Sequence, residues 1–317
     1  AWWRAARHTS RHARHLPTNV TGRDPLVVAT YSRRMELLLP DGRKVDARIK
    51  GKRLKPVCGD RVEADPIPGE TDWLITAVRE RRNELTRPNL RGKVEVLAAN
   101  IDRLLVMAAP APEPEWAIVD RYLCAAELID ASAAVVFNKS DLAVGDAVDK
   151  VLDDYARIGY ATLRCSARNG SNIDAVAELM SDGVSIIVGQ SGVGKSSLIN
   201  GLLEDDRQRV AAISERSGEG RHTTVNSAML QLPGGGAVID SPGVRDYAPA
   251  LQPDEVVVGY REIAASAQDC RFANCRHLRE PGCAVKGAVD DGTISKRRYD
   301  SYRHLLALTT KLTSGQY

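Results

Sequence analysis

Lys195 and Ser196 directly follow a glycine-rich run, and this segment has the residue types to bind phosphate. The run and its continuation read Gly189-Gln190-Ser191-Gly192-Val193-Gly194-Lys195-Ser196-Ser197. Glycines let successive backbone N–H groups point at one anion, and a helix that starts at Lys195 adds its positive N-terminal end. An apolar run precedes the segment and a helical pattern follows it, so a chance glycine turn is the weaker interpretation. We therefore expect a nucleotide, with Lys195 at its β- and γ-phosphates and Ser196 as a magnesium ligand.

Two further segments have the residue types to read a purine base. Asn138-Lys139-Ser140-Asp141 ends one apolar run, and Cys165-Ser166-Ala167 ends the next. The Asp141 carboxylate can accept hydrogen bonds from both N1–H and the exocyclic amine of guanine, whereas adenine has no matching donor pair. Backbone N–H groups of 165–167 are expected at the guanine O6. Each segment alone fits an ordinary loop, but together they predict GTP rather than ATP, because the wrong base would leave a carboxylate unpaired.

Asp240-Ser241-Pro242-Gly243 ends a third apolar run and completes the expected phosphate site. We expect Asp240 to hold magnesium through a water and the Gly243 N–H to contact the γ-phosphate, although a simple strand-end turn also fits. In Ras-like enzymes a Gln after this motif orients the attacking water. Here the position is Val244, which cannot form that hydrogen bond. Slow turnover of the chain alone is therefore expected.

The segment Gly220-Arg-His-Thr-Thr offers a replacement for that Gln. We hypothesise that His222 positions the attacking water; a solvated or RNA-contacting His is the alternative. Thr223 or Thr224 should complete the magnesium coordination, and the position relative to His222 favours Thr224. The predicted catalytic residues are accordingly Lys195, His222 and Thr224.

Cys270, Cys275, His277 and Cys283 lie within 14 residues of one another and form a candidate metal centre. Three thiolates and one imidazole are a complete tetrahedral set for one structural zinc ion, with no open position. Free buried thiols beside a stray His are the alternative. The other cysteines are far apart, so the pattern indicates a metal site in a reducing compartment rather than a disulfide framework.

Two patterns of hydrophobic residues, one before and one after residue 100, indicate the strands and helices that must position these side chains. Short apolar runs at 26–30, 35–39, 45–49, 61–64 and 73–78 predict a small all-β barrel, and 79–93 reads as a basic linker. After residue 100 the pattern is that of a parallel α/β sheet. The expected strands are 103–109, 133–137, 161–165, 185–188, 228–232 and 237–239, and the expected helices are 116–129, 147–158, 173–180 and 195–203.

Charge is unevenly distributed along the 317 residues, whose net charge is only +3. Residues 1–93 carry 21 Lys+Arg against 11 Asp+Glu, whereas the remainder carries 23 against 30. The excess predicts an anionic partner for the N-terminal part. Two clusters favour nucleic acid over an ordinary solvated surface. The first is the basic run 43–55, and the second comprises Arg271, Arg276, Arg279, Lys286, Lys296, Arg297 and Arg298.

The order of the motifs is unusual, because the base-reading segments precede the phosphate loop. An ordinary GTPase has them after it. A circular permutation explains the order. The helix expected at 173–180 runs antiparallel to the strand before it and ends near the start of the strand that leads into the phosphate loop, so only residues 181–184 are needed to join the two. In the permuted order the GTPase part ends after the loop at 240–243, so this switch loop leads directly into the C-terminal part. We therefore expect the nucleotide state to be transmitted to the C-terminal part.

These motifs in this order resemble the RsgA (YjeQ) family of small-ribosomal-subunit-dependent GTPases, over roughly residues 20–312. One departure is Val225, where many relatives have a third Thr. The resemblance implies a multidomain chain with an all-β OB-fold RNA-binding domain (20–93), a circularly permuted α/β P-loop GTPase domain (94–250) and a small α-helical zinc domain (251–317). The basic N-terminal tail (1–19) precedes these domains, and residues 1–17 fall outside the resemblance. It implies GTP or GDP, magnesium and one zinc as ligands.

The resemblance also implies a role in late maturation of the small ribosomal subunit, with rRNA contact, turnover stimulated by the subunit and release coupled to hydrolysis. No membrane partner is expected, since no apolar run approaches the roughly 18 residues of a membrane span. A cytoplasmic location is expected, and so is a monomer, because nothing in the chain demands a dimer. Residues 1–17 contain no apolar core segment, so we expect no secretory signal there. The sequence does not start with Met, which suggests a processed or trimmed end. The alternatives are a GTPase of translation or tRNA modification, and an RNA-binding checkpoint that holds GTP only as a structural ligand.

Overall fold

A closed β-barrel forms the N-terminal part of the described chain. The computed structural model describes residues 23–32, 34–51, 53–88, 94–203, 225–241 and 251–313. Within these ranges the barrel strands are β1 (Leu26–Tyr31), β2 (Met35–Leu38), β3 (Lys44–Ile49), β4 (Val62–Pro66) and β5 (Trp73–Val78). β1, β2 and β3 are antiparallel neighbours, β3 is parallel to β5, and β5 is antiparallel to β4. Hydrogen bonds from Val27 N–H to Asp60 O and from Val62 N–H to Pro25 O close the ring. The predicted OB-type barrel is confirmed.

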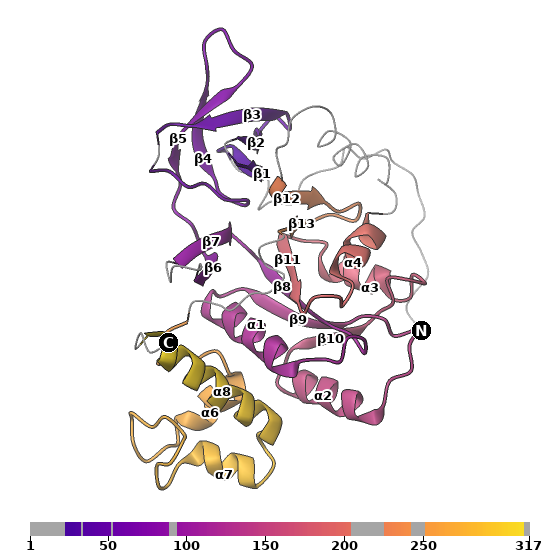
Figure 1. Cartoon of the computed structure of the whole chain (residues 1–317), viewed down its shortest axis with the longest axis vertical. Coiled ribbons are helices and arrows are strands. Elements are labelled where there is room, and N and C mark those ends of the chain that lie inside the picture. Colours follow the sequence, from indigo (N-terminus) through magenta and orange to yellow (C-terminus); the bar gives the residue numbers. More distant parts are fainter. Residues whose placement is uncertain are drawn as a thin grey trace, which may run out of the picture.

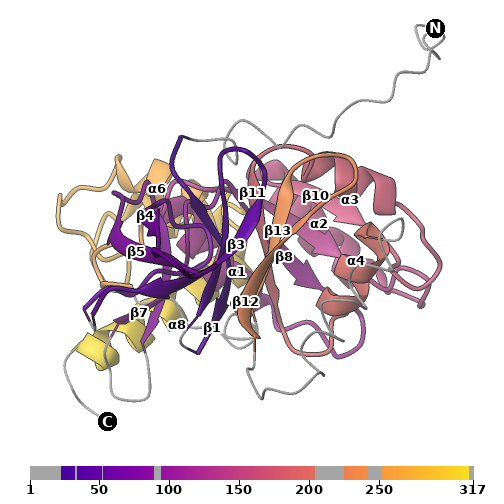
Figure 2. The same ribbon diagram turned by 90° about the horizontal axis from the view of Figure 1, so that it is seen from above.

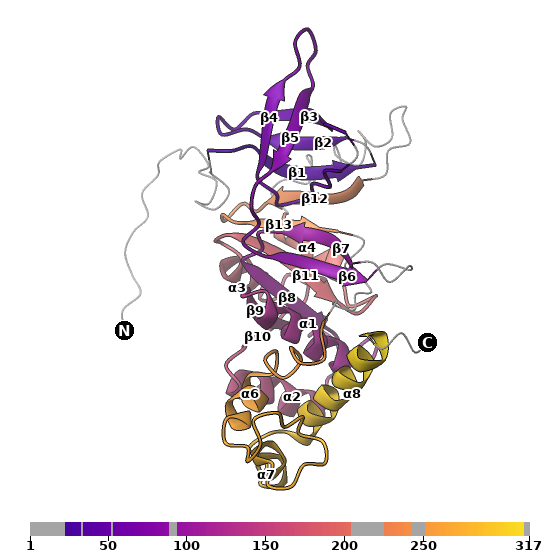
Figure 3. The same cartoon turned by 90° about the vertical axis from the view of Figure 1, so that its left-hand side faces the viewer.

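A β-hairpin follows the barrel where a linker was expected. β6 (Glu84–Pro88) pairs antiparallel with β7 (Val94–Ala99), so the prediction of a linker over 79–93 is wrong. Its many basic residues suggested a solvated segment, but Arg81 is held by Asp60 and Glu84, and Leu85 is fully buried. In Figure 1 the hairpin lies below β4 and β5 of the barrel and above α1, and Figure 3 shows it at the level of β11 in the α/β part.

The α/β part contains the strands and helices expected after residue 100. Its strands are β8 (Arg103–Ala108), β9 (Ser132–Phe137), β10 (Ala161–Arg164), β11 (Val184–Gly189), β12 (Val225–Gln231) and β13 (Ala237–Asp240). Its helices are α1 (Trp116–Leu128), α2 (Asp146–Arg157), α3 (Ile173–Leu179) and α4 (Lys195–Leu202). The strand order is β10-β9-β8-β11-β13-β12, parallel except for β12. α2 has acidic residues in its first turn and Arg157 in its last, which matches the helix dipole.

The barrel and the α/β part share one continuous sheet (Figure 2). β12 pairs antiparallel with β1, with Ala228 opposite Ala29. Alternate residues of β1 then face different cores: Val27 packs inside the barrel, whereas Leu26 and Val28 pack with the α/β core around Leu104. The barrel is thus joined to the α/β part by both hydrogen bonds and buried apolar surface.

The C-terminal part is helical and has its own core. It contains α6 (Arg261–Ala267), α7 (Ala284–Asp290) and α8 (Lys296–Thr313), which lie beside α1 at the end of the molecule opposite the barrel (Figure 3). Tyr260, Ile263 and Tyr302 are buried there together with Cys124 of α1. No helix in the described ranges combines the length and the apolar character needed to cross a bilayer.

The structure corrects the prediction that Arg297 and Arg298 contact RNA phosphates. Arg298 is fully buried and pairs with Asp120 of α1 and Glu262 of α6. Arg297 pairs with the second oxygen of Asp120. A run of cations at the start of a helix suggested a solvated face, but the acid that pairs with both arginines lies more than 170 residues earlier, on the buried side of α1.

Candidate functional site

The glycine-rich run forms a tight loop between β11 and α4. Gly189, Gly192 and Gly194 have φ values of 139°, 81° and 98°. A Cβ on Gly189 would lie 2.2 Å from the Met107 carbonyl oxygen, so glycine is required by contact as well as by φ. Lys195 Nζ donates to the carbonyl oxygens of Gly189 at 2.6 Å and Gln190 at 2.8 Å, which holds its side chain along the loop.

Asn138 joins the first base-reading segment to the phosphate loop. Its side chain is buried, and Nδ2 donates to the Val193 carbonyl oxygen at 2.9 Å. Its Oδ1 accepts the Ala167 N–H at 3.0 Å. Lys139 adds a second link, since its Nζ donates to the Gly192 and Ala111 carbonyl oxygens. Segments that are distant in sequence, at 138–141, 165–167 and 189–194, are therefore brought together as predicted.

Ser166 positions the carboxylate expected to read guanine. Ser166 Oγ donates to Asp141 Oδ1 at 2.6 Å, and this hydrogen bond lowers the pKa of Asp141 below its ordinary value. Arg168 lies 3.9 Å from the other carboxylate oxygen. Asp141 is thereby kept ionised, the form that accepts hydrogen bonds from both guanine donors.

The backbone N–H groups expected at the guanine O6 all donate within the protein. Cys165 N–H donates to Phe137 O, Ser166 N–H to Ser171 O, and Ala167 N–H to Asn138 Oδ1. Ser140 N–H donates to Cys165 O, which ties the two base-reading segments to each other. The contact with O6 stays a prediction.

The expected magnesium ligands lie at the carboxyl ends of neighbouring strands. Asp240 ends β13, which runs parallel to β11, and Ser196 lies in the first turn of α4 directly after the phosphate loop. Next to Asp240, Ser227 Oγ donates to Ser241 Oγ at 2.9 Å. The remaining residues predicted for this part of the site, His222, Thr223, Thr224, Gly243 and Val244, fall outside the described residues.

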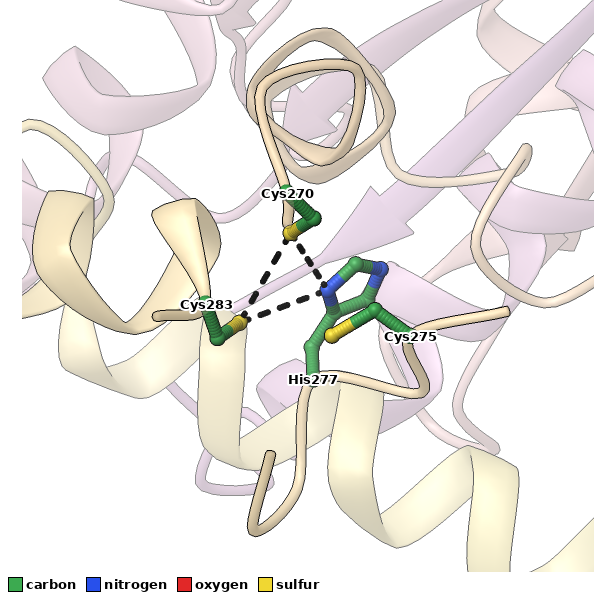
Figure 4. Close-up of side chains that lie close together, drawn as sticks. All are labelled: Cys270, Cys275, His277 and Cys283. Atoms are coloured by element: carbon green, nitrogen blue, oxygen red, sulfur yellow. Dashed lines mark hydrogen bonds between the residues drawn. The ribbon is translucent and has the colours of Figure 1, made fainter. Parts of the chain in front are cut away.

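The cysteine and histidine cluster has the geometry of a tetrahedral zinc site (Figure 4). Cys270 Sγ and Cys283 Sγ are 3.9 Å apart, and each lies 3.5 Å from His277 Nδ1. Zinc–sulfur bonds of about 2.3 Å imply an edge of about 3.8 Å between two thiolates of a tetrahedron. All four ligand atoms, including Cys275 Sγ, lie within 4.8 Å of one another. The residues present therefore fit one zinc ion.

The backbone and burial around His277 support metal binding through Nδ1. Tyr299 donates its hydroxyl to the His277 carbonyl oxygen at 2.6 Å, and His277 has a left-handed φ of 59°. Burial lowers the pKa of His277, which favours the neutral imidazole that ligates metals. Tyr302 donates to the neighbouring Arg276 carbonyl at 3.0 Å, so α8 holds the metal loop at two consecutive carbonyls.

Comparisons with known proteins agree with the site. The family model described as RsgA GTPase matches residues 78–249. Curated relatives named small ribosomal subunit biogenesis GTPase RsgA include one from Azotobacter vinelandii, 39% identical with 96% of this chain and 91% of the relative covered. One from Pseudomonas aeruginosa is 38% identical with the same coverage. The chain belongs to the RsgA GTPase family. It is therefore a GTPase.

Solved structures agree with the fold of this family member. YjeQ from Thermotoga maritima matches with a TM-score of 0.71 at 28% identity, covering 91% of this chain and 98% of that one. YloQ, described as a circularly permuted GTPase, matches with a TM-score of 0.71 at 24% identity, covering 96% and 98%. The circular permutation expected from the motif order is confirmed.

Glu115 is a residue of this GTPase site that the sequence analysis missed. Gln190 of the phosphate loop donates Nε2–H to Glu115 Oε1 at 3.0 Å, and its Oε1 accepts the Glu115 N–H at 3.3 Å. The pair attaches the segment before α1 to the loop. Glu115 stands in a proline-rich stretch with no spacing to any motif, so no sequence signal pointed to it.

The described cations of the basic run 43–55 divide into two groups, and Lys52 falls outside the described residues. Three of its cations form ion pairs: Arg43 with Asp41, Lys44 with Glu36, and Arg48 with Glu70 and Asp72. Lys50, Arg53 and Lys55 are exposed and form no ion pair with any described residue. The unpaired charge therefore lies in the loop after β3 rather than on the β2–β3 surface.

Proposed function

We propose that this GTPase assists the late maturation of the small ribosomal subunit, binding the subunit and its rRNA in the GTP form and leaving after hydrolysis. It acts as a cytoplasmic monomer. The extent of the similarity carries this proposal: 96% of the chain aligns with relatives named for small-subunit biogenesis, so the match is not confined to the nucleotide site.

In this proposal the residues around the phosphate loop bind GTP. Lys195 contacts the β- and γ-phosphates, Gly243 contacts the γ-phosphate, and the 138–141 and 165–167 segments hold the base. Ser196, Thr224 and Asp240 ligate magnesium, which when bound neutralises charge on the phosphates. The packing of Asn138 against Val193 supports this assignment, because it fixes the distance between the base-reading and phosphate-binding segments.

His222 is proposed to orient the attacking water once the subunit is bound. Val244 stands where Ras-like enzymes have Gln, so the chain alone is expected to turn over slowly. Replacing His222 by Ala should remove most of the subunit-stimulated turnover and leave GTP affinity unchanged. Unchanged stimulation in that variant would exclude this role for His222.

The four-ligand centre is proposed to hold a structural zinc ion. Its four protein ligands leave no open position, so zinc would order the loop that carries Arg276 and Arg279 rather than take part in hydrolysis. Both arginines, with Arg271 and Lys286, remain candidates for contact with rRNA phosphates.

GTP turnover with and without ribosomal subunits tests the proposed function. We expect strong stimulation by small subunits, none by large subunits or bulk tRNA, and loss of turnover in Lys195→Ala. Stimulation by tRNA would favour a GTPase of another RNA pathway. Binding of GTP without turnover in a single-turnover assay with subunits would favour a checkpoint that uses GTP only as a structural ligand.

A further inference from the structure

A cleft of about 770 Å³ opens between the barrel and the β6–β7 hairpin. The loop after β3 contributes Arg53 and Lys55, the end of β5 leads to Arg79 and Arg81, and β7 contributes Val94 and Val96. The volume lies within the range of about 300–1,000 Å³ that is usual for ligand-binding clefts. The hairpin that forms one wall lies below β4 and β5 of the barrel in Figure 1.

The charge that this cleft offers is positive. Arg53 and Lys55 are exposed and form no ion pair among the described residues. Arg79 and Arg81 are held by acids, Arg79 by Asp24 and Glu63 and Arg81 by Asp60 and Glu84. Glu95 is the sole acid among the described residues lining the cleft, and Arg87 neutralises it. An anionic partner therefore meets two free cations at the rim.

The other walls of the cleft are apolar. Leu54, Val57 and Val78 line it together with Val94, a residue that is 63% exposed although it lies on a strand. An unpaired nucleotide matches this combination, because its base has a free face for apolar and guanidinium contacts and its phosphate is anionic. A duplex hides its base faces, and an acidic peptide uses only the cations.

The surface on which an OB barrel commonly binds nucleic acid is less suitable in this chain. Strands 2 and 3, with the loop between strands 1 and 2 and the loop between strands 4 and 5, usually form that surface. Here Lys44 is paired with Glu36, and Arg48 is paired with Glu70 and Asp72 of the β4–β5 loop. The two strand cations of this surface are thus neutralised from within the barrel, and its exposed Arg34 in the β1–β2 loop is the one cation left there by the described ion pairs.

We propose that the cleft between the barrel and the β6–β7 hairpin binds an unpaired RNA strand. Arg53 and Lys55 contact its phosphates, and a base packs against Leu54, Val78 and Val94. The inference rests on the proposed function, in which the RNA belongs to the small subunit, and it names the surface of the barrel that such RNA contacts.

Binding of a fluorescent single-stranded RNA of about 12 nucleotides to the full chain tests the proposal. The variant Arg53→Ala/Lys55→Ala should bind about tenfold more weakly near 0.1 M salt. The slope of log affinity against log salt should become shallower by about 1.4, because each phosphate contact to a single strand contributes about 0.7. The matched control Arg43→Ala/Lys44→Ala removes the same charge from the β2–β3 surface and should change affinity less than about twofold.

Four results would overturn the proposal: no binding of the RNA by the unmodified chain, equal loss in both double variants, equal affinity for a duplex of the same length, or displacement of the RNA by a polyglutamate peptide. A second variant, Val94→Asp, should also weaken binding while intrinsic GTP turnover stays unchanged. These RNA measurements need no ribosome. Failure of small subunits to stimulate turnover would therefore overturn the proposed function separately.

Discussion

Arg298 of α8 and Asp120 of α1 form a fully buried ion pair, with Nη1 and Oδ1 2.8 Å apart. Tyr155 donates its hydroxyl to the same carboxylate at 2.6 Å, and Glu262 holds the other edge of the guanidinium. The pair joins the α/β part to the helices that carry the metal centre. Each buried charge depends on its partner, because neither can be hydrated in place.

Replacing Asp120 by Ala should destabilise the protein by about 3 kcal/mol or more, since it leaves Arg298 buried without one of its two acidic partners. Urea unfolding measures the change. Lys296→Ala, which removes an exposed pair with Asp300, is the control and should cost less than about 1 kcal/mol. Similar losses in the two variants would contradict the importance of the buried pair.

Replacing Ser166 by Ala should weaken GTP binding and change its dependence on pH. The Ser166 hydrogen bond lowers the pKa of Asp141, so its loss raises that pKa. Tight GTP binding requires ionised Asp141, so it is present above the pKa of Asp141 and is lost as the pH falls through that pKa. The loss should therefore begin at a higher pH in the variant, as titration with a fluorescent GTP analogue would record.

Ser171→Ala is a control for the same loop, because Ser171 is exposed, accepts the Ser166 N–H through its carbonyl oxygen, and forms no hydrogen bond with Asp141 in the described part of the chain. It should retain the pH profile of the unmodified chain. A pH profile for Ser166→Ala that coincides with this control would show that the hydroxyl does not set the ionisation of Asp141.

Replacing Gly194 by Ala should abolish nucleotide binding. A Cβ there would lie 2.4 Å from Asn138 Nδ2, and the φ of 98° is unfavourable for alanine. Gly234→Ala is the matched control, since nothing lies within 4 Å of its added Cβ. Calorimetric titration with GDP should show binding for the control alone; binding by both variants would be inconsistent with the contact between the two segments.

Replacing Cys283 by Ser should remove zinc and unfold the C-terminal helices while GDP binding persists. Purified chain should contain about one zinc per molecule by elemental analysis, because the four ligands form a single centre. Cys58→Ser, a buried cysteine of the barrel region, is the control and should retain the metal. Full zinc content in Cys283→Ser would exclude this ligand set.

Local patterns in the sequence sufficed for most of the fold and for the meeting of the segments 138–141, 165–167 and 189–194. Strands such as β8, β9 and β11 are almost wholly apolar, and the motifs at their ends carry distinctive residue types. The features that escaped prediction depend on partners remote in sequence. β6 was hidden by arginines whose acids lie elsewhere, and the burial of Arg298 depends on Asp120.

The pairing of β1 with β12 likewise had no local signal, because any two strand edges can form the same backbone hydrogen bonds. Glu115 lacked a signal for a different reason. Its contact with Gln190 is made by one side chain in an irregular segment, where no periodicity applies.

The β1–β12 pairing also determines which pieces of this protein can exist alone. β12 is the last strand of the α/β sheet, and the barrel supplies the hydrogen-bonding partner for its outer side. Cutting the chain after the hairpin would leave that strand as a bare sheet edge, the kind of surface on which copies of a protein stack and aggregate. The barrel is thus a protective cover for the GTPase sheet as well as a module of its own, and an excised GTPase part would need a replacement strand to stay monomeric.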